Sequence, residues 1–485
     1  MKRSHVLFGL TVVVGLVLGG AQAEAQTPAR VYSVSGDCGG KPATTVRMAP
    51  GLCLGLVWQG AGAEGPRMPR GLMPLEGGDW LVTDLGGWDA GKGAVWRLSF
   101  AGDGAVRWRR LTGGLSMPHT VARGPDGRVY VSEMNRILTL DPEAADPAAS
   151  VRTVIGDLPD NRLHDNRHPL SSFVFDGNGD LLVNVGAPSD RCLDGAGKVK
   201  ADARGACVEE AATAQVRRHA YLGNGRWAEE SRVFASGLRN SIALVRHPAG
   251  TILQAENSVD LPTPEHPFDE VNVLRQGGHY GWPYCVDLAT PLPGWSAGQA
   301  RCGERDQPTA LLPPHAAPLD MIYYDGAMFP ELRGRLLMTW HGYRRTAGRI
   351  TAVETDEAGV PLTDVGGRYA IYPRGSLAYP AGAPSVKGKV LTPGWDRVAG
   401  RQPRGSPVVM AVAADGSIWV TDDRSRAILR KSRNSGISAA SPVQPTHARS
   451  LIRKGKWARW LTPIPGCRTR KTPAGWRATP GFGMI

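Results

Sequence analysis

Nothing in this chain of 485 residues resembles a Rossmann dinucleotide fingerprint, a Ser-His-Asp nucleophile elbow or a zinc site. None of its seven cysteines stands in a CxxC or CxxCH pattern, which argues against a zinc ribbon and an attached c-type haem. After the N-terminal region no apolar run is long enough to cross a membrane. The sequence therefore predicts neither a nicotinamide enzyme nor a fused electron-carrying haem module, so any electrons must leave through a separate acceptor.

The two ends of the chain differ in composition from its body. Residues 1–25 have a short basic start, an apolar core of about 15 residues and small residues at the end, as in a cleavable secretory signal; the alternative is a membrane anchor. Residues 432–485 hold ten Lys and Arg and no acid, and account for most of the net charge of +13. We expect 432–485 to be a disordered basic extension, although it could touch anionic surfaces. The body is close to neutral, so we expect no nucleic-acid partner. Because no later segment is long and apolar enough, we expect no stable membrane span after signal cleavage.

Six of the seven cysteines form three local pairs, each of which brackets a loop rich in Gly or Pro: Cys38/Cys53, Cys192/Cys207 and Cys285/Cys302. Export to an oxidising compartment, periplasmic or extracellular, favours disulfides at such pairs. We predict three disulfides, and Cys467 is left over.

One short pattern, a glycine turn followed by an apolar β-rich run, recurs six times. The copies are GDWLVTD at Gly78, GRVYVSE at Gly127, GDLLVNV at Gly179, GTILQAE at Gly250, GRLLMTW at Gly334 and GSIWVTD at Gly416. Glycine supplies the positive φ of a tight hairpin, and the run suits a buried strand. Successive glycines are spaced by one propeller blade or by a blade with an insertion. The pattern favours an all-β, six-bladed β-propeller (26–431) with disulfide-stapled loop insertions over a β-sandwich.

Ionisable residues gather 8 to 12 positions upstream of the repeat glycines. In a propeller these positions lie where the inner strands begin, at one rim of the central channel. The set is Arg70, His119, His168 with Ser171, Arg239 with Asn240, and Arg404 with Ser406; the fifth repeat instead runs into His341, Arg344 and Arg345. Several Arg and His residues would thus meet at one rim, which suits an anionic cofactor and a general base.

The segment 237–285 carries a family resemblance. It reads GLRN, LQAEN, DEVNVLRQGG and HYGWPYC, with Asp269 and Glu270 in an expected polar loop. This order resembles the signature blade of the soluble quinoprotein glucose and sorbosone dehydrogenases, and the resemblance extends over about 68–431. It implies a six-bladed propeller that binds pyrroloquinoline quinone (PQQ) and calcium and oxidises a small-molecule sugar.

The resemblance also implies roles for individual residues. His168 corresponds to the general base, Arg239 to the arginine over the quinone and Asn240 to its cofactor contact. The backbone carbonyls of Ser258 and Val259 correspond to calcium ligands. Further candidates for binding the cofactor or lining its pocket are Arg344, Arg345, Arg404, His119 and His341.

Three positions depart from the family pattern. Ser171 and Ser172 replace the usual Gly-Arg or Arg-Asn, and Ala187 replaces an acid, so that Asp190 is the candidate to orient His168. Ser241 stands where the family has Pro. Two other functions stay open: a non-catalytic propeller that binds a ligand or partner, and a calcium-dependent propeller lactonase, which would need carboxylates at the channel centre.

Overall fold

The computed structural model describes residues 32–156, 158–159, 166–261, 263, 266–342, 348–365, 382–395 and 405–434. The predicted signal peptide, Cys467 and nearly all of the predicted tail lie outside these residues. The last strand, β33, runs to Arg433, so the propeller continues two residues beyond the predicted boundary at residue 431. Within the described part of the chain, no helix is long and apolar enough to span a membrane.

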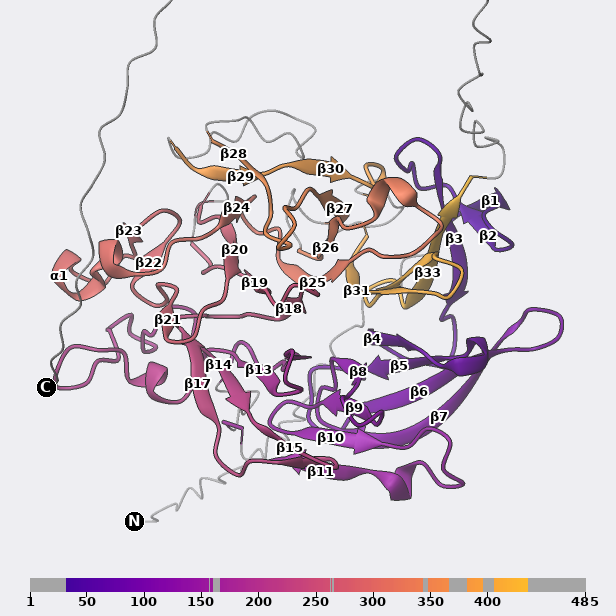
Figure 1. Cartoon of the computed structure of the whole chain (residues 1–485), viewed down its shortest axis with the longest axis horizontal. Helices are drawn as coiled ribbons and strands as arrows, with labels where there is room; N and C mark the ends of the chain where they lie inside the picture. The colour runs from indigo at the N-terminus through magenta and orange to yellow at the C-terminus, as the bar shows by residue number, and fades with distance from the viewer. Residues whose placement is uncertain are drawn as a thin grey trace, which may run out of the picture. The chain divides into compact units, whose positions relative to one another are not determined.

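Six sheets of at least four strands form the blades, in chain order around a ring (Figure 1). Blade 1 consists of β4 (Pro69–Pro74), β5 (Trp80–Asp84), β6 (Gly93–Phe100) and β7 (Val106–Leu115). Blade 2 consists of β8 (Val121–Arg123), β9 (Val129–Ser132), β10 (Ile137–Leu140) and β11 (Arg152–Ile155). Blade 3 consists of β12 (Phe173–Phe175), β13 (Leu181–Val185), β14 (Gln215–His219) and β17 (Arg232–Ser236), to which β21 (Gly278–His279) is added in parallel. The predicted propeller is therefore confirmed through its first half.

The second half of the ring repeats the pattern with longer connections. Blade 4 consists of β18 (Ala243–Arg246), β19 (Ile252–Glu256), β20 (Asp269–Val273) and β24 (Ala310–Leu312), extended by β29 (Pro384–Val386) and β28 (Thr363–Val365). Blade 5 consists of β25 (Pro318–Tyr323), β26 (Leu336–Trp340), β27 (Arg349–Val353) and β30 (Gly388–Val390). Blade 6 consists of β31 (Pro407–Val412), β32 (Ile418–Asp422), β33 (Ala427–Arg433) and β3 (Leu52–Gln59). Asp269 and Glu270 thus begin a buried strand and do not lie in a polar loop as predicted.

The N-terminal strand β3 closes the ring. It pairs antiparallel with β33 from Leu52↔Arg433 to Gln59↔Ala427, so the last blade takes its outer strand from the start of the described chain (Figure 1). The small strands β1 (Val34–Asp37) and β2 (Pro42–Thr44) extend this sheet. The other small elements are β15 (Tyr221–Gly223), β16 (Arg226–Trp227), β22 (Cys285–Val286), β23 (Thr290–Pro291), α1 (Ala297–Ala300), and the 3₁₀ turns η1 (Glu76–Gly78), η2 (Ala148–Ser150), η3 (Val208–Ala211), η4 (Cys302–Glu304) and η5 (Pro330–Leu332).

All three predicted disulfides are present. Cys38–Cys53, Cys192–Cys207 and Cys285–Cys302 link residues 15, 15 and 17 positions apart. The last two fix the insertions after β13 and β20, as predicted. Closing a loop of this size stabilises a protein by roughly 3 kcal/mol, because it restricts the unfolded chain.

Each repeat glycine begins its second strand from a positive-φ turn, with φ between 76° and 100° at Gly78, Gly127, Gly179, Gly250, Gly334 and Gly416. Five positions after the glycine stands a small side chain: Thr83, Ser132, Asn184, Ala255, Thr339 and Thr421. Four of these residues carry a hydroxyl group that donates to a backbone carbonyl of the next blade at 2.6–2.8 Å. The pairs are Thr83 to His119, Ser132 to Ser171, Thr339 to Val408 and Thr421 to Arg70. The repeat therefore encodes both the hairpin and a bond between blades that fixes the rim.

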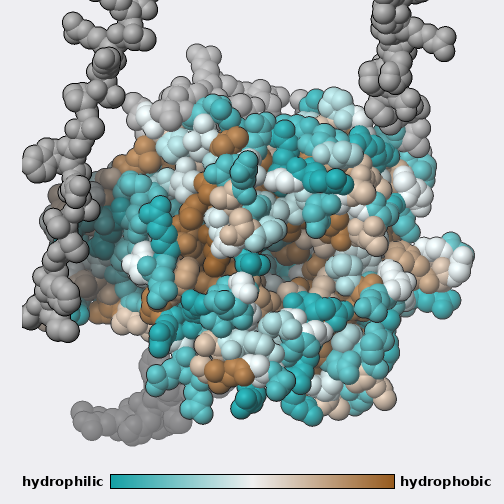
Figure 2. Space-filling view, viewed as in Figure 1, coloured by the Kyte–Doolittle hydropathy of each residue, from teal (hydrophilic) through white to brown (hydrophobic). Residues whose placement is uncertain are grey.

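An apolar cluster lies on the central axis, because all six blades contribute to it: Leu85, Met117, Met134, Leu170, Ile242, Leu319 and Val408. Seen from the side drawn in Figure 2, polar residues cover most of the outer surface and apolar residues come into view mainly toward the middle of the face. The site described next lies at the rim, where the inner strands begin.

Candidate functional site

Strand register brings the candidate residues to one rim. The inner strand of each blade pairs antiparallel with the second strand, for example Pro69↔Asp84 in blade 1 and Pro407↔Asp422 in blade 6. Residues just before an inner strand and residues just after a second strand therefore share an edge of the propeller. The predicted rim residues stand just before the inner strands. The loops that surround them come just after the second strands.

His168 is buried, with 7% of its surface exposed, and its ring has a fixed orientation. Nδ1 lies 2.6 Å from the backbone oxygen of Ala187. A carbonyl oxygen only accepts, so Nδ1 carries the proton and Nε2 of the neutral ring is the basic atom. Burial and the charge of Arg239 lower the pKa of His168 well below 6.5, against the opposing effect of the Ala187 bond. The ring is thus neutral at neutral pH, with its basic lone pair on Nε2.

The predicted link between Asp190 and His168 is wrong. The Asp190 carboxylate accepts a bond from Arg239 Nη2 at 2.7 Å, and the Ala187 carbonyl takes the place of an acid beside His168. Gly186 allows the backbones of residues 168 and 187 to come this close, because a Cβ at position 186 would lie 2.5 Å from the backbone oxygen of His168. The His168 ring is therefore oriented by a neutral peptide group.

Arg239 is 5% exposed and is fixed through its guanidinium. Nη1 donates to the Asn257 oxygen at 2.8 Å, and Nη2 lies 2.7 Å from Asp190 Oδ1 and 3.7 Å from Asp260 Oδ2. Its backbone oxygen accepts from Ala187 N at 2.8 Å. The backbone of one residue, Ala187, therefore holds both His168 of blade 3 and Arg239 of blade 4.

Two buried polar atoms on neighbouring residues have no hydrogen-bond partner among the described residues, Arg239 Nε and Asn240 Oδ1. Leaving such groups unpaired costs roughly 1–3 kcal/mol each, so they are suited to a polar ligand. These atoms offer one donor and one acceptor, which fits the heteroatoms of a planar quinone. The residues present are therefore compatible with PQQ.

Oxygen ligands suited to calcium lie beside Arg239. A cavity of about 10 Å³, room for one water molecule or ion, is lined by Glu256, Ser258, Val259 and Glu270 among others. Burial raises the pKa of Glu256 to about 7, and burial with the repulsion of Glu256 raises that of Glu270 well above its ordinary value. Hard oxygen donors fit a calcium ion, and a cation there would favour the ionised form of both carboxyl groups. Ser258 and Val259 were predicted from the sequence. The two carboxyl groups, Glu256 and Glu270, were not, although they stand in the LQAEN and DEVNV motifs.

A second ionic group lies at the opposite part of the ring, where blades 5, 6, 1 and 2 meet. The Asp423 carboxylate forms an ion pair with Arg70 Nη2 at 2.8 Å and a hydrogen bond with His341 Nε2 at 2.9 Å. Burial alone would raise the pKa of Asp423, but His341 and Arg70 hold it well below its usual range. Burial also lowers the pKa of His341, so at neutral pH Nε2–H donates as a neutral ring and Arg70 supplies the compensating charge. Asp423 was missed, although it directly follows the sixth repeat.

His119 joins this group in a neutral state. Burial and the charge of Arg70 lower its pKa to about 3, and Nε2 is buried without a partner among the described residues. Its Nδ1 lies 3.4 Å from Thr120 Oγ1, which donates to Ser172 Oγ at 3.1 Å. Ser171 Oγ donates to the Met134 oxygen. The two serines that depart from the family pattern are therefore buried connectors between blades 2 and 3.

Arg344, Arg345 and Arg404, predicted to bind the cofactor, lie outside the described residues. Their roles stay predictions. Of the predicted site residues that are described, the structure brings together His168, Arg239, Asn240, Ser258 and Val259 on blades 3 and 4. It places His119 and His341 with Arg70 on the other side of the ring.

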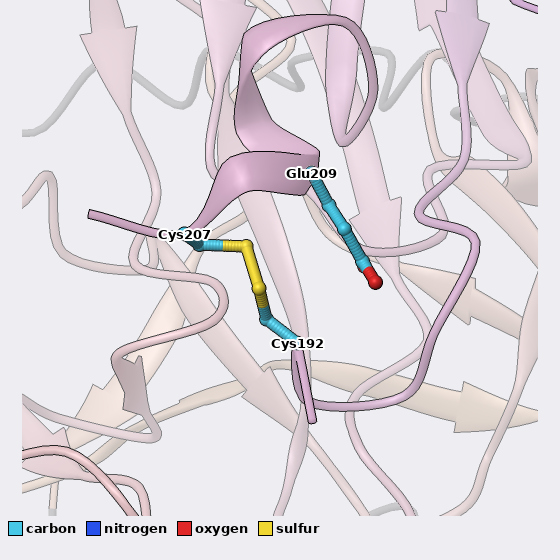
Figure 3. Close-up of side chains that lie close together, drawn as sticks. All are labelled: Cys192, Cys207 and Glu209. Carbon is cyan, nitrogen blue, oxygen red and sulfur yellow. A yellow bond between two sulfur atoms is a disulfide. The ribbon is translucent and has the colours of Figure 1, made fainter. Parts of the chain in front are cut away.

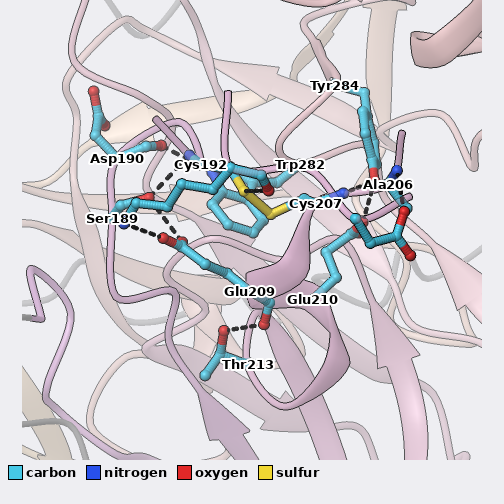
Figure 4. Close-up of a disulfide and its surroundings, with 12 residues drawn as sticks. Ser189, Asp190, Cys192, Ala206, Cys207, Glu209, Glu210, Thr213, Trp282 and Tyr284 are labelled. Carbon is cyan, nitrogen blue, oxygen red and sulfur yellow. Dashed lines mark hydrogen bonds and ion pairs between the residues drawn. A yellow bond between two sulfur atoms is a disulfide. The ribbon is translucent and has the colours of Figure 1, made fainter. Parts of the chain in front are cut away.

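A stapled loop supports Asp190. Cys192, Cys207 and Glu209 lie close enough to hold a metal ion (Figure 3), but the cysteines are joined as a disulfide and have no thiolate to offer. Glu209 instead accepts from Ser189 Oγ at 2.7 Å. The backbone oxygen of Asp190 accepts from Trp282 Nε1 at 2.8 Å (Figure 4). The disulfide loop and the aromatic corner after β21 thus fix the carboxylate that holds Arg239.

The fold and the rim together define a six-bladed propeller with a buried neutral histidine and a buried, ion-paired arginine on adjoining blades. Residues 135–345 match the family model described as Glucose / Sorbosone dehydrogenase, which confirms the predicted resemblance over this range. An uncharacterized protein of Borreliella burgdorferi is 27% identical over 209 residues, 42% of this chain and 49% of that protein. The chain thus spans about half the length of this curated relative.

Several solved structures share the fold at low identity. A carbohydrate-active enzyme of family AA12 from Trichoderma reesei is 20% identical, with a TM-score of 0.57 over 80% of this chain and 97% of that one. The holo form of the pyranose dehydrogenase PQQ domain from Coprinopsis cinerea is 21% identical, with a TM-score of 0.56 over 82% and 99%. The apo form of the soluble aldose sugar dehydrogenase from Escherichia coli is 15% identical, with a TM-score of 0.52 over 79% and 100%.

Proposed function

We propose that the chain is an exported quinoprotein oxidoreductase, which oxidises a sugar at a C–OH group with His168 as general base. The observation that carries this proposal is the backbone of Ala187: its carbonyl accepts from His168 Nδ1 at 2.6 Å, and its N–H donates to the Arg239 oxygen at 2.8 Å. The Ala187 carbonyl keeps the ring proton of His168 on Nδ1, so Nε2 is the basic atom. The Ala187 N–H holds the backbone of Arg239 on the adjoining blade. The family match over 135–345 and the likeness to sugar dehydrogenases in fold support the same function.

In this proposal each residue has a defined task. Nε2 of His168 takes the proton of the sugar hydroxyl, and its second nitrogen keeps donating to Ala187. Bound PQQ supplies the acceptor for the hydride that leaves the sugar carbon. Arg239 and Asn240 hold the cofactor through the two atoms that lack partners among the described residues. Arg344, Arg345 and Arg404 bind its carboxylates.

Calcium would be held by the carbonyls of Ser258 and Val259, with Glu256 and Glu270 at the same cavity. An ion held there would offset the repulsion between the buried carboxylates and would supply a Lewis acid for the quinone. The electrons then pass to a separate carrier or mediator. The signal peptide predicted from the sequence and the three disulfides support a periplasmic or extracellular location.

Reconstitution tests the proposal. The purified chain is incubated with PQQ and calcium, and dye reduction is followed with a panel of aldoses. We expect reduction that depends on both the quinone and a sugar, and loss of it in Arg239→Ala. If the chain binds the quinone but oxidises no sugar of the panel, the enzymatic proposal is contradicted and a binding propeller is favoured. Hydrolysis of a lactone that needs calcium but no quinone favours the lactonase.

A further inference from the structure

One position of the repeat is polar in blade 4 and apolar in the other five blades. Four residues after the repeat glycine, those five blades have the buried side chains Val82, Val131, Val183, Met338 and Val420. The fourth repeat has Gln254 at this position, and Gln254 is fully buried. Its partner in the strand register, Asn272, is fully buried as well. Blade 4 therefore has a buried amide pair, in the same blade as the carboxyl groups of Glu256 and Glu270.

Strand alternation places the two amides on the same face of the sheet as the two carboxyl groups. Gln254 and Glu256 are two positions apart on β19, Glu270 and Asn272 are two positions apart on β20, and Glu256 pairs with Glu270 in the register. Ile252, two positions before Gln254, packs in an apolar cluster with residues of blade 3. The face thus changes from apolar to polar as it approaches the rim.

Hydrogen bonds join the amide pair to both carboxyl groups. Gln254 Nε2 donates to Glu256 Oε2 at 2.7 Å, and Gln254 Oε1 accepts from Asn272 Nδ2 at 3.1 Å. The same Asn272 nitrogen lies 3.4 Å from Glu270 Oε2. The two amides therefore form a bridge of side chains between Glu256 and Glu270, the carboxyl groups that line the small cavity beside Arg239.

The fold does not require this amide pair. Five blades fill the position of Gln254 with an apolar side chain and form the same hairpin. Asn272 Oδ1 is buried and has no hydrogen-bond partner among the residues that the structure describes. An unsatisfied buried acceptor lowers stability, whereas an apolar pair of similar shape has no such cost. The amides are therefore explained better by the carboxyl groups that they contact than by the stability of the blade.

We infer that Gln254 and Asn272 are positioning residues for the calcium ion, because they fix the orientation of the carboxyl groups of Glu256 and Glu270 at the cavity. This inference rests on the calcium site of the proposed function. Asn240 N donates to Glu256 Oε1 at 3.0 Å, so the same carboxyl group is also held by a candidate cofactor residue. Residues that orient the ligands of a metal typically change its affinity by about 10–100-fold when they are replaced.

Calorimetric titration of calcium into the purified full chain without quinone tests the inference. Gln254→Met introduces the residue type of Met338 and removes the donor to Glu256, so we expect calcium affinity to fall at least about tenfold. Thr351→Val is the matched control, because Thr351 is fully buried and faces Met338 in the register as Asn272 faces Gln254. Its calcium affinity should equal that of the wild type. Equal calcium affinity in Gln254→Met and the wild type, or no calcium binding by the wild type, overturns the inference.

A double variant separates positioning from a structural role. Gln254→Met leaves the Asn272 amide without its acceptor, and Asn272→Thr in the same chain removes that amide and reproduces the Met338–Thr351 pair of blade 5. We expect the urea midpoint of the double variant, measured without calcium, to lie above that of Gln254→Met. Its calcium affinity should stay at least about tenfold below that of the wild type. If the affinity recovers together with the midpoint, the amides are structural only and the inference is wrong.

The calcium titration is independent of sugar oxidation. Weaker calcium binding in Gln254→Met supports the positioning role even if the wild-type chain oxidises no sugar, a result that would defeat only the proposed enzymatic function. Quinone-dependent oxidation by the wild type together with unchanged calcium affinity in Gln254→Met defeats only the positioning role.

Discussion

Replacing His168 with alanine removes a buried imidazole whose Nδ1 lies 2.6 Å from the Ala187 oxygen. General-base catalysis contributes about 10²–10⁴-fold, so turnover should fall by that factor, or roughly 3–5 kcal/mol of transition-state stabilisation. The Ala187 oxygen also loses its donor, which costs roughly 1–3 kcal/mol of folding free energy. Binding of PQQ should persist, since Arg239 and Asn240 remain.

His168→Asn separates the two effects. Its amide nitrogen can still donate to the Ala187 oxygen, but it has no basic nitrogen. We therefore expect His168→Asn to unfold in urea close to the wild type and to be as inactive as His168→Ala. The assay is steady-state dye reduction beside a urea titration of each variant. Wild-type turnover in either variant refutes the assignment of His168, and recovery of activity in His168→Asn assigns it a structural role.

The same residue sets the pH dependence. Burial first, and then Arg239 and Arg167, lower the pKa of His168 well below 6.5. A base with a lowered pKa stays unprotonated as the pH falls through 6.5, so kcat/KM should hold at that pH and decline only below it. An acid limb centred at or above pH 6.5 in the pH–rate profile contradicts the described environment.

Other contacts give further tests. Asp190→Asn keeps the shape of the side chain but leaves the buried Arg239 with less negative charge; we expect a loss of about 2–4 kcal/mol in urea unfolding, and an unchanged midpoint contradicts the pairing. Removing the staple with Cys192→Ser and Cys207→Ser should cost about 3 kcal/mol, and peptide mapping that finds both thiols free in the wild type refutes it. Thr421→Val removes a hydroxyl bond to the next blade and should cost about 1–2 kcal/mol, so equal stability would show that this bond does not hold the blades together.

The sequence predicted the blades well, because the turn and strand signals are local. Each repeat glycine has the positive φ that its pattern requires, and the second strand follows it. The hydroxyl five positions later was not identified as a bond between blades, because its acceptor lies in another repeat. The pairing of β3 with β33 joins residues almost 400 positions apart, and no local pattern marks β3 as the outer strand of the last blade.

The sequence predicted the candidate residues that stand a fixed distance before a repeat glycine. It did not predict the contacts that depend on the direction of a side chain. His168 and Arg239 came from their distance to the repeat glycine. Asp190 was assigned to the wrong partner because its direction depends on a distant residue, Trp282, whose Nε1 donates to its backbone oxygen at 2.8 Å. Asp423 lay outside the spacing rule, since it follows a second strand and does not precede an inner one.

In the proposed function this rim binds a quinone through Arg239 and Asn240. Titration of PQQ into the purified chain at saturating calcium, followed by calorimetry, tests it most directly. We predict one quinone per chain, with binding weakened at least tenfold in Arg239→Ala, as expected on loss of a charge-assisted hydrogen bond. No binding of PQQ to the folded wild-type chain at saturating calcium would contradict the account.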